Sequence, residues 1–206
     1  MKYYNSNQEE IPSVTTLLKF VNNHLDNWAN YMGFKGINVK DYLSEKASHG
    51  THIHSLCDSY FHGVPINSEE LTFKLDTIKE LFSRKGYEYY QSEYSLSGES
   101  FGGTLDLVLY NQEKDDYIII DFKTSKNDYH KHYLQLAGYT LLLQEVCNAS
   151  VKAVCVILIE KPIADSKFIN LRLREDNLHN EKILTLISNI YYECNTKERK
   201  FYYEST

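Results

Sequence analysis

The sequence predicts an α/β fold in which a helical N-terminal region precedes a central mixed β-sheet flanked by helices. Two apolar runs of strand length, 102–110 and 117–123, are separated by a short polar segment and predict a β-hairpin. A strand at 87–96 precedes them. A helix-length segment follows at 129–147, and the continuous apolar run at 151–160 suits a strand inside a sheet. These elements give a sheet whose last inner strand is reached through a helix.

Length and composition indicate one globular domain. The chain has 206 residues, enough to bury a core, and its 42% hydrophobic and 24% charged content is that of an ordinary globule. We expect one domain over 1–206, with a helical region at 1–86, a core at 87–160 and a final strand and helix at 161–206. The sequence shows no run of membrane-spanning length and no apolar signal segment at its start. We therefore expect a cytoplasmic protein that does not contact a membrane.

The N-terminal region is predicted to contain three helices. The first begins near Ser13, a suitable N-cap, and Val14, Leu17, Leu18, Val21 and Leu25 would form its apolar face. The second covers 38–62, with a break near Gly50 left open. The third covers 66–86, with Asn67 or Ser68 as its cap. Towards the C-terminus we expect an edge strand at 167–173 and a helix at about 176–194.

Two aspartates follow or interrupt apolar strands and need a reason to be there. Asp121 comes directly after three isoleucines, and Asp106 lies in the preceding predicted strand. A carboxylate at the end of a buried strand loses hydration unless it is paired or bound to a metal. If the two strands are neighbours, both carboxylates can converge on one divalent cation, and such oxygen ligands suit Mg²⁺ or Mn²⁺. Lys123, two residues after Asp121, shares its face of the strand.

The predicted helix at 129–147 adds further polar groups near this end of the sheet. Gln135 and Tyr139 are four residues apart and therefore lie on one helix face. Lys126 and Lys131, with two neighbouring histidines, form a local basic cluster that suits a nucleic-acid backbone. The net charge of −6 argues against binding of nucleic acid by bulk positive charge, but it leaves room for a local basic groove.

The ordered set of Asp106, Asp121-x-Lys123 and Gln135-x-x-x-Tyr139 resembles the PD-(D/E)XK nucleases, and its helix motif resembles their RecB-like branch. The resemblance implies a restriction-endonuclease-like core, with Asp106 and Asp121 holding Mg²⁺ or Mn²⁺ together with the backbone carbonyl of Phe122. It also implies that Lys123 stabilises charge at the phosphate and that Gln135 and Tyr139 orient Lys123 or contact the phosphate. The residue before Asp106 is Leu105 where the motif's name has proline, a common departure in this superfamily.

Two more phrases extend the resemblance into the N-terminal half. Residues 50–58 fit the Gly-Thr-x-x-His-x-x-x-(Glu/Asp) helix of RecB-like nucleases, which makes His54 a candidate metal ligand and catalytic residue. The spacing of the neighbouring histidines does not suit a four-coordinate zinc site. Glu93 is a second-shell or second-metal candidate, or an ordinary strand glutamate.

The phrase Pro-Ser-Val-Thr-x-x-Leu at 12–18 is similar to the opening of phage exonucleases and of the mitochondrial genome maintenance exonuclease family. By that resemblance Ser13 and Thr15 are candidate phosphate contacts at a helix N-terminus. Simple helix capping by Ser13 is the alternative reading of the same residues.

The four cysteines, at 57, 147, 155 and 194, are far apart and show no Cys-x-x-Cys spacing. Some RecB-like nucleases hold an iron–sulfur cluster with one upstream cysteine and a C-terminal group of three. Cys194 is the single cysteine in the last part of this sequence, so we expect no such cluster.

The resemblance implies a DNA nuclease, by analogy an exonuclease that prefers single-stranded ends, acting in phage or bacterial DNA replication, recombination or repair. Two alternatives stay open at this point: a structure-selective or restriction-type endonuclease on the same core, and a DNA- or protein-binding module without catalysis. The sequence leaves open the polarity of cleavage, the choice between DNA and RNA, the number of metals and the oligomeric state.

Overall fold

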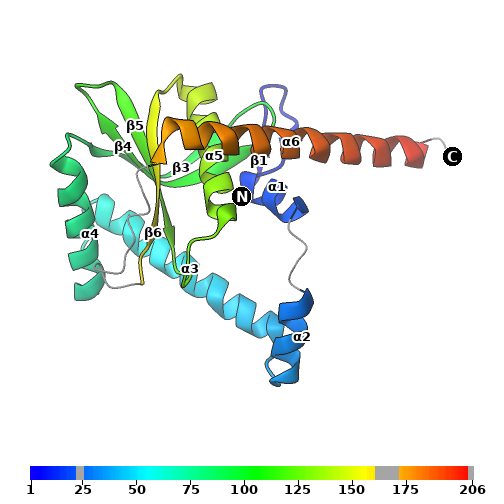
Figure 1. Cartoon of the computed structure of the whole chain (residues 1–206), viewed down its shortest axis with the longest axis horizontal. Helices are drawn as coiled ribbons and strands as arrows, with labels where there is room; N and C mark the ends of the chain where they lie inside the picture. Colours follow the sequence, from blue (N-terminus) through cyan, green and yellow to red (C-terminus); the bar gives the residue numbers. More distant parts are fainter. Residues whose placement is uncertain (22–25, 161–171, 204–206) are drawn as a thin grey trace.

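A mixed five-stranded sheet forms the centre of the protein (Figure 1). The computed structural model describes residues 1–21, 26–160 and 172–203. In the order in which the strands lie side by side, the sheet contains β3 (Glu88–Ser97), β4 (Gly102–Asn111), β5 (Asp116–Lys123), β6 (Val151–Leu158) and β7 (Arg172–Leu173). β3, β4 and β5 pair antiparallel, β5 and β6 pair parallel, and β7 is antiparallel to β6. The prediction of an α/β fold with a central mixed sheet is confirmed.

Helices cover both faces of this sheet (Figure 1). On one face, α5 (His130–Cys147) packs on the strands together with α1 (Val14–Val21) and α6 (Arg174–Tyr203). On the other face lie α3 (Val39–Phe61) and α4 (Glu69–Ser83). The short α2 (Asp26–Phe34) lies at the N-terminal end of α3, away from the sheet.

The sheet separates two hydrophobic cores, and β5 contributes to both. Ile118 and Ile120 belong to the core under α3 and α4, whereas Ile119 belongs to the core under α5. All three side chains are buried, which follows from the alternation of side chains along a strand covered on both faces. Burial of each contributes roughly 1.5–3 kcal/mol to the free energy of folding. The apolar core thus fixes the strand that ends in Asp121 and Lys123.

Local polar contacts set the helix boundaries. The side chain of Asn38 accepts hydrogen bonds from the backbone N–H groups of Lys40 and Asp41 and begins α3. Ser68 caps α4 by accepting from Leu71 N at 3.3 Å, so the serine is the cap among the two candidates. Asn148, in the left-handed region at φ 52°, ends α5.

Several elements differ from the sequence-based expectations. α3 continues through Gly50 without a break, and α6 runs from Arg174 to Tyr203, further than expected, because neither proline nor glycine interrupts that segment. Two short strands, β1 (Tyr3–Tyr4) and β2 (Glu10–Ile11), and the helix α2 were not predicted. Of the predicted edge strand, Arg172 and Leu173 form β7, while 167–171 lie outside the described residues, as does Leu25.

Among the helices that the structure describes, none is both long enough and apolar enough to cross a membrane. The cytoplasmic location stays a prediction.

Candidate active site

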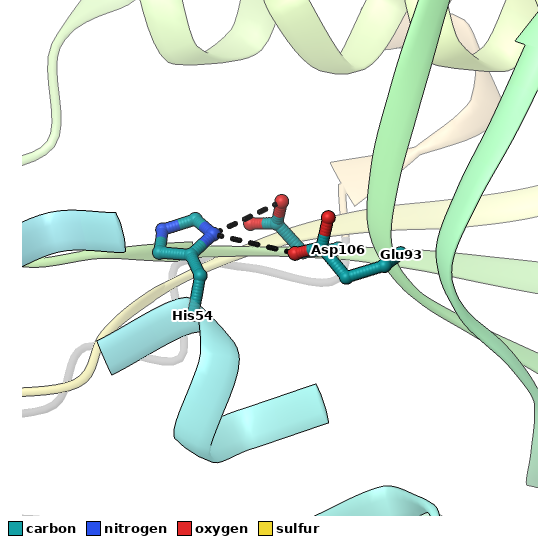
Figure 2. Close-up of side chains that lie close together, drawn as sticks. All are labelled: His54, Glu93 and Asp106. Atoms are coloured by element: carbon teal, nitrogen blue, oxygen red, sulfur yellow. Dashed lines mark ion pairs between the residues drawn. The ribbon is translucent and has the colours of Figure 1, made fainter. Parts of the chain in front are cut away.

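Three potential metal ligands from different elements converge where α3 packs against the middle of β3 and β4 (Figure 2). His54 comes from α3, Glu93 from β3 and Asp106 from β4. The Nδ1 atom of His54 lies 3.3 Å from Asp106 Oδ1 and 4.0 Å from Glu93 Oε1. One ligand atom from each residue lies within 4.8 Å of the others, a spacing at which one cation can be bound.

Glu93 and Asp106 face each other across the antiparallel pair of β3 and β4. They occupy the position between the paired residues Ser92 and Leu107 on one side and Tyr94 and Leu105 on the other. Like charges placed directly opposite each other in neighbouring strands destabilise a sheet. Glu93 also has a φ of 44°, a left-handed conformation that costs a non-glycine residue of order 1–3 kcal/mol. A bound cation would offset the repulsion, so both costs point to a site.

Charges and burial shift the pKa values of this group. Burial alone would lower the pKa of His54, but the Asp106 and Asp121 carboxylates outweigh it and leave that pKa raised. Burial, together with the charge of Asp106, raises the pKa of Glu93. His54 and Glu93 therefore both hold a proton more tightly than the isolated side chains do, and the Asp106 carboxylate contributes to both shifts.

Asp106 is fixed by the neighbouring strand. Its Oδ2 atom accepts a hydrogen bond of 2.8 Å from the backbone N–H of Phe122. Regular pairing of β4 with β5 stops at Leu107 and Ile120, so the Asp106 side chain takes the place of a main-chain acceptor. This bond brings Asp106 next to the end of β5, as expected for carboxylates on neighbouring strands.

Asp121 is fully buried and lies beside Lys123. The Lys123 ammonium donates a 2.7 Å hydrogen bond to Oδ1 and lies 2.6 Å from Oδ2. Within the described part of the chain, Oδ2 is buried without a hydrogen bond of good geometry. Burial raises the pKa of Asp121, and the Lys123 charge opposes that rise. The pair agrees with the expectation that both side chains share one face.

Gln135 and Tyr139 form a hydrogen-bonded pair on α5. The side-chain amide of Gln135 donates to the Tyr139 hydroxyl at 2.6 Å. Burial and the charges of Asp121 and Asp106 raise the pKa of Tyr139 well above its usual value, so the phenol stays protonated and faces the anionic site. Gly103 lies under its ring, where an added Cβ would come within 2.8 Å of Tyr139 Cε1.

A cavity of about 410 Å³ opens beside the three ligands and brings in a residue to which the sequence had assigned no role. Asp58, four residues after His54 on α3, lines it together with His54 and Glu93. Ser92 donates a 2.6 Å hydrogen bond to Asp58 and is itself buried. The i, i+4 spacing from His54 was the available signal, because it places both side chains on one helix face.

The candidate nucleic-acid contacts lie at helix starts. The Ser13 hydroxyl accepts a 3.0 Å hydrogen bond from Thr16 N, so it caps α1, and it also bonds to the Thr15 hydroxyl at 2.8 Å. A role of Ser13 and Thr15 in phosphate binding stays a prediction. Lys126 and Lys131 are exposed on either side of the start of α5.

Comparison with protein-family models identifies the family of this chain. A family model described as the PD-(D/E)XK nuclease superfamily matches residues 64–198. The chain belongs to the PD-(D/E)XK nuclease superfamily. The matched range includes Glu93, Asp106, Asp121 and Lys123, whereas His54 lies outside it and joins the site through α3. Comparison with curated proteins gives no match.

Members of the PD-(D/E)XK superfamily are nucleases that use divalent metals, and the residues here fit such an ion. The donors are mainly carboxylate oxygens with one imidazole, a set that suits Mg²⁺ or Mn²⁺. Asp121 Oδ2, which is buried and paired with the Lys123 ammonium at 2.6 Å without a hydrogen bond of good geometry, is a further acceptor for a cation.

Proposed function

We propose that this protein is a Mg²⁺- or Mn²⁺-dependent deoxyribonuclease of the RecB-like branch that degrades DNA from single-stranded ends. The observation that carries the proposal is the convergence of His54, Glu93 and Asp106 beside the buried Asp121–Lys123 pair. Repulsion between Glu93 and Asp106 is easiest to account for if the site binds a cation, which in turn binds an anionic substrate. The whole chain, 1–206, would act as a single nuclease domain.

The cation would be held by His54, Asp106 and Asp121, with the Phe122 carbonyl and Glu93 as further donors. When bound, such an ion supplies Lewis acidity, which polarises a phosphodiester and acidifies water. Lys123 presents an ammonium group to negative charge that develops on the phosphate. The ammonium is held by Asp121, so little conformational freedom of the flexible lysine side chain is lost when substrate binds.

The Gln135–Tyr139 pair would serve the phosphate. The Tyr139 oxygen accepts a hydrogen bond from Gln135, so its own O–H points away from that amide. This O–H can donate a hydrogen bond to a phosphate oxygen. The raised pKa keeps that proton in place at neutral pH. Lys126, Lys131, Ser13 and Thr15 would contact the backbone of the strand further from the reacting phosphate.

Digestion of defined substrates tests the proposal. A linear single strand, a linear duplex, a single-stranded circle and an RNA strand of the same sequence are incubated with Mg²⁺, Mn²⁺ or EDTA. We expect cation-dependent loss of the linear single-stranded DNA, an intact circle and no activity in Asp121→Ala. Differential end labels then report the polarity.

Other outcomes reassign the protein. Cutting of the circle would place it among endonucleases, and preferential loss of RNA would change the substrate class. An intact set of substrates under both metals, with the purified chain folded, would contradict a nuclease and favour a binding module.

A further inference from the structure

Tyr129 is a large aromatic residue on the surface next to the candidate active site. It stands immediately before α5, and the residue is 47% exposed. The short segment 124–128 connects it to Lys123 at the end of β5. Exposure of single aromatic residues is common in globular proteins, so the position and the neighbours of this ring decide what it can do.

The ring is held in place by His132. The two ring centroids are 5.4 Å apart and the planes are nearly perpendicular, at 81°. The backbone N–H of Tyr129 donates to His132 Nδ1 at 3.3 Å, and His132 is 4% exposed. His132 in turn lies close enough to feel the charge of Lys123. The backbone hydrogen bond fixes the main chain of Tyr129, and the edge contact with His132 favours one ring position, so less conformational freedom would be lost on contact with a ligand.

Cations accompany the ring. The Lys131 ammonium lies 5.6 Å from the centroid of the Tyr129 ring, within the range of a cation–π contact. In a chain of net charge −6, residues 123–132 contain three lysines and one aspartate. That aspartate, Asp128, accepts a hydrogen bond from Tyr133. Across 1–21, 26–160 and 172–203, neither Lys126 nor Lys131 forms an ion pair with a carboxylate.

A flat, partly exposed ring with an unpaired ammonium group over one face matches a ligand that is both flat and anionic, which can stack on the other face. A nucleotide has these properties, since its base can stack on the ring while its phosphate meets the ammonium. A base within a duplex is already stacked on both faces, whereas an unpaired base has a face to offer. The geometry therefore selects for unpaired nucleotides.

We propose that Tyr129, with Lys131, forms a stacking platform for one unpaired base of the DNA strand bound at the active site. This inference rests on the proposed nuclease function and gives it a physical source of preference for single-stranded DNA. Tyr129 acts on substrate binding and does not touch the reacting phosphate.

Binding of fluorescent oligonucleotides tests the platform apart from cleavage. Full-length Asp121→Ala protein is titrated in EDTA into single-stranded DNA that contains 2-aminopurine, whose fluorescence falls when it stacks. Anisotropy of an end-labelled strand gives the Kd in parallel. We expect quenching at one or two neighbouring positions, and the Tyr129→Leu change should remove it and raise the Kd by about 10-fold. Tyr129→Phe should keep both signals.

Tyr90→Leu is the matched control. Tyr90 is 41% exposed and lies among other tyrosines of the sheet, with its ring centroid 5.3 Å from that of Tyr117 near the β4–β5 turn. We expect the parental Kd and quenching from this variant. Thermal unfolding of each variant verifies that the fold is intact.

The outcomes separate the platform from the nuclease proposal. Equal Kd values and quenching for Tyr129→Leu, Tyr129→Phe and the parent would overturn the platform, while digestion by the wild type would still support the nuclease. Conversely, quenching that depends on Tyr129, together with a wild-type protein that cuts no substrate, would overturn the nuclease proposal and leave a binding platform. Duplex DNA bound as tightly as single strands, with the same dependence on Tyr129, would contradict selection for unpaired bases.

Discussion

Each end of the β4–β5 pair holds a buried aspartate, but the two aspartates have different partners. At the turn end, regular pairing reaches Asn111 and Asp116, and the Asp116 carboxylate accepts a 2.6 Å hydrogen bond from the neutral Tyr87 hydroxyl. At the other end, regular pairing stops at Leu107 and Ile120. There Asp121 lies against Lys123, with one oxygen lacking a hydrogen bond in the described structure.

The difference separates a structural carboxylate from a functional one. Asp116 has a neutral donor and closes a turn, and burial with the Asp116 charge raises the pKa of Tyr87 so that this donor keeps its proton. Asp121 is instead close enough to Lys123, Asp106 and His54 for their charges to act on it. Burial by itself does not distinguish the two acids; the charged surroundings of Asp121 do.

The largest effect on the cleavage rate should come from removing the negative charge of Asp121, with the same change at Asp116 as its comparison. We expect Asp121→Asn to lower the rate of cleavage of linear single-stranded DNA by about 10³-fold, because it removes an anionic donor at the site. Asp116→Asn keeps an acceptor for Tyr87 and should leave the rate within about 3-fold of wild type. Initial rates with Mn²⁺ measure both. Similar losses in the two variants would break the distinction between the ends of the strands.

Addition of a divalent cation should stabilise the functional end. At a concentration of 100 times its Kd, an ion that binds the folded state alone contributes about 2.7 kcal/mol. For a chain of this size that corresponds to a rise in Tm of roughly 5–10 °C. We expect this rise for the wild type and for Asp116→Asn, and little or none for Asp106→Asn. Differential scanning calorimetry with Mn²⁺ and with EDTA provides the measurement, and an equal rise in all three proteins would place the ion elsewhere.

Gly103 should be intolerant of a side chain at the same end. An added Cβ would lie 2.8 Å from Tyr139 Cε1 and 3.2 Å from Leu142 Cδ1, so Gly103→Ala should cost about 1–3 kcal/mol of unfolding free energy and displace Tyr139. Gly33 has no atom within 4 Å of an added Cβ in the described structure, and Gly33→Ala in α2 should be neutral or stabilising by up to about 1 kcal/mol. Urea unfolding compares them. Equal stability of the two variants would show that the strand relaxes around the new methyl group.

The smallest effect is a loss of folding stability at low pH, which we attribute to protonation of His132. This histidine is a buried neutral group at the functional end. Burial, with the charges of Lys123 and Lys131, lowers the pKa of His132 to about 4. Because the unfolded histidine titrates near 6.5, stability is fully present above that pH and is lost as the pH falls towards 4. Between pH 7 and pH 5 we expect a loss of about 1–2 kcal/mol that His132→Gln does not show. Urea unfolding at both pH values checks this, and an unchanged pH dependence in the variant would exclude His132 as its source.

The sequence predicted the sheet well because its strands are marked by composition. The three isoleucines of β5 and the apolar run of β6 are buried on both faces, and the polar segment between β4 and β5 is the turn. Two-residue strands such as β1 and β2 are too short to show a period. The full length of α6 was missed because its last residues are charged and aromatic and show no apolar face.

The sequence indicated most of the residues that the structure brings together here, but not their geometry; their roles stay predictions. Alternation along one strand was enough to pair Asp121 with Lys123. The position of Glu93 opposite Asp106 depends on the register between β3 and β4, which local sequence does not determine. For the same reason Glu93 remained an even choice between a strand residue and a ligand. Asp58 is the last position of the 50–58 motif, but its place in the cavity depends on the packing of α3 against β3, which one sequence does not reveal.

The backbone of Glu93 has a consequence for laboratory selection. At φ 44° glycine and asparagine have less backbone strain than glutamate, so a screen for thermal stability would favour them at position 93. Either replacement also removes a like charge facing Asp106, which adds to the gain. Stabilised variants of this protein would therefore tend to lose a carboxylate from the site, and heat resistance and affinity for a divalent ion should move in opposite directions at this residue.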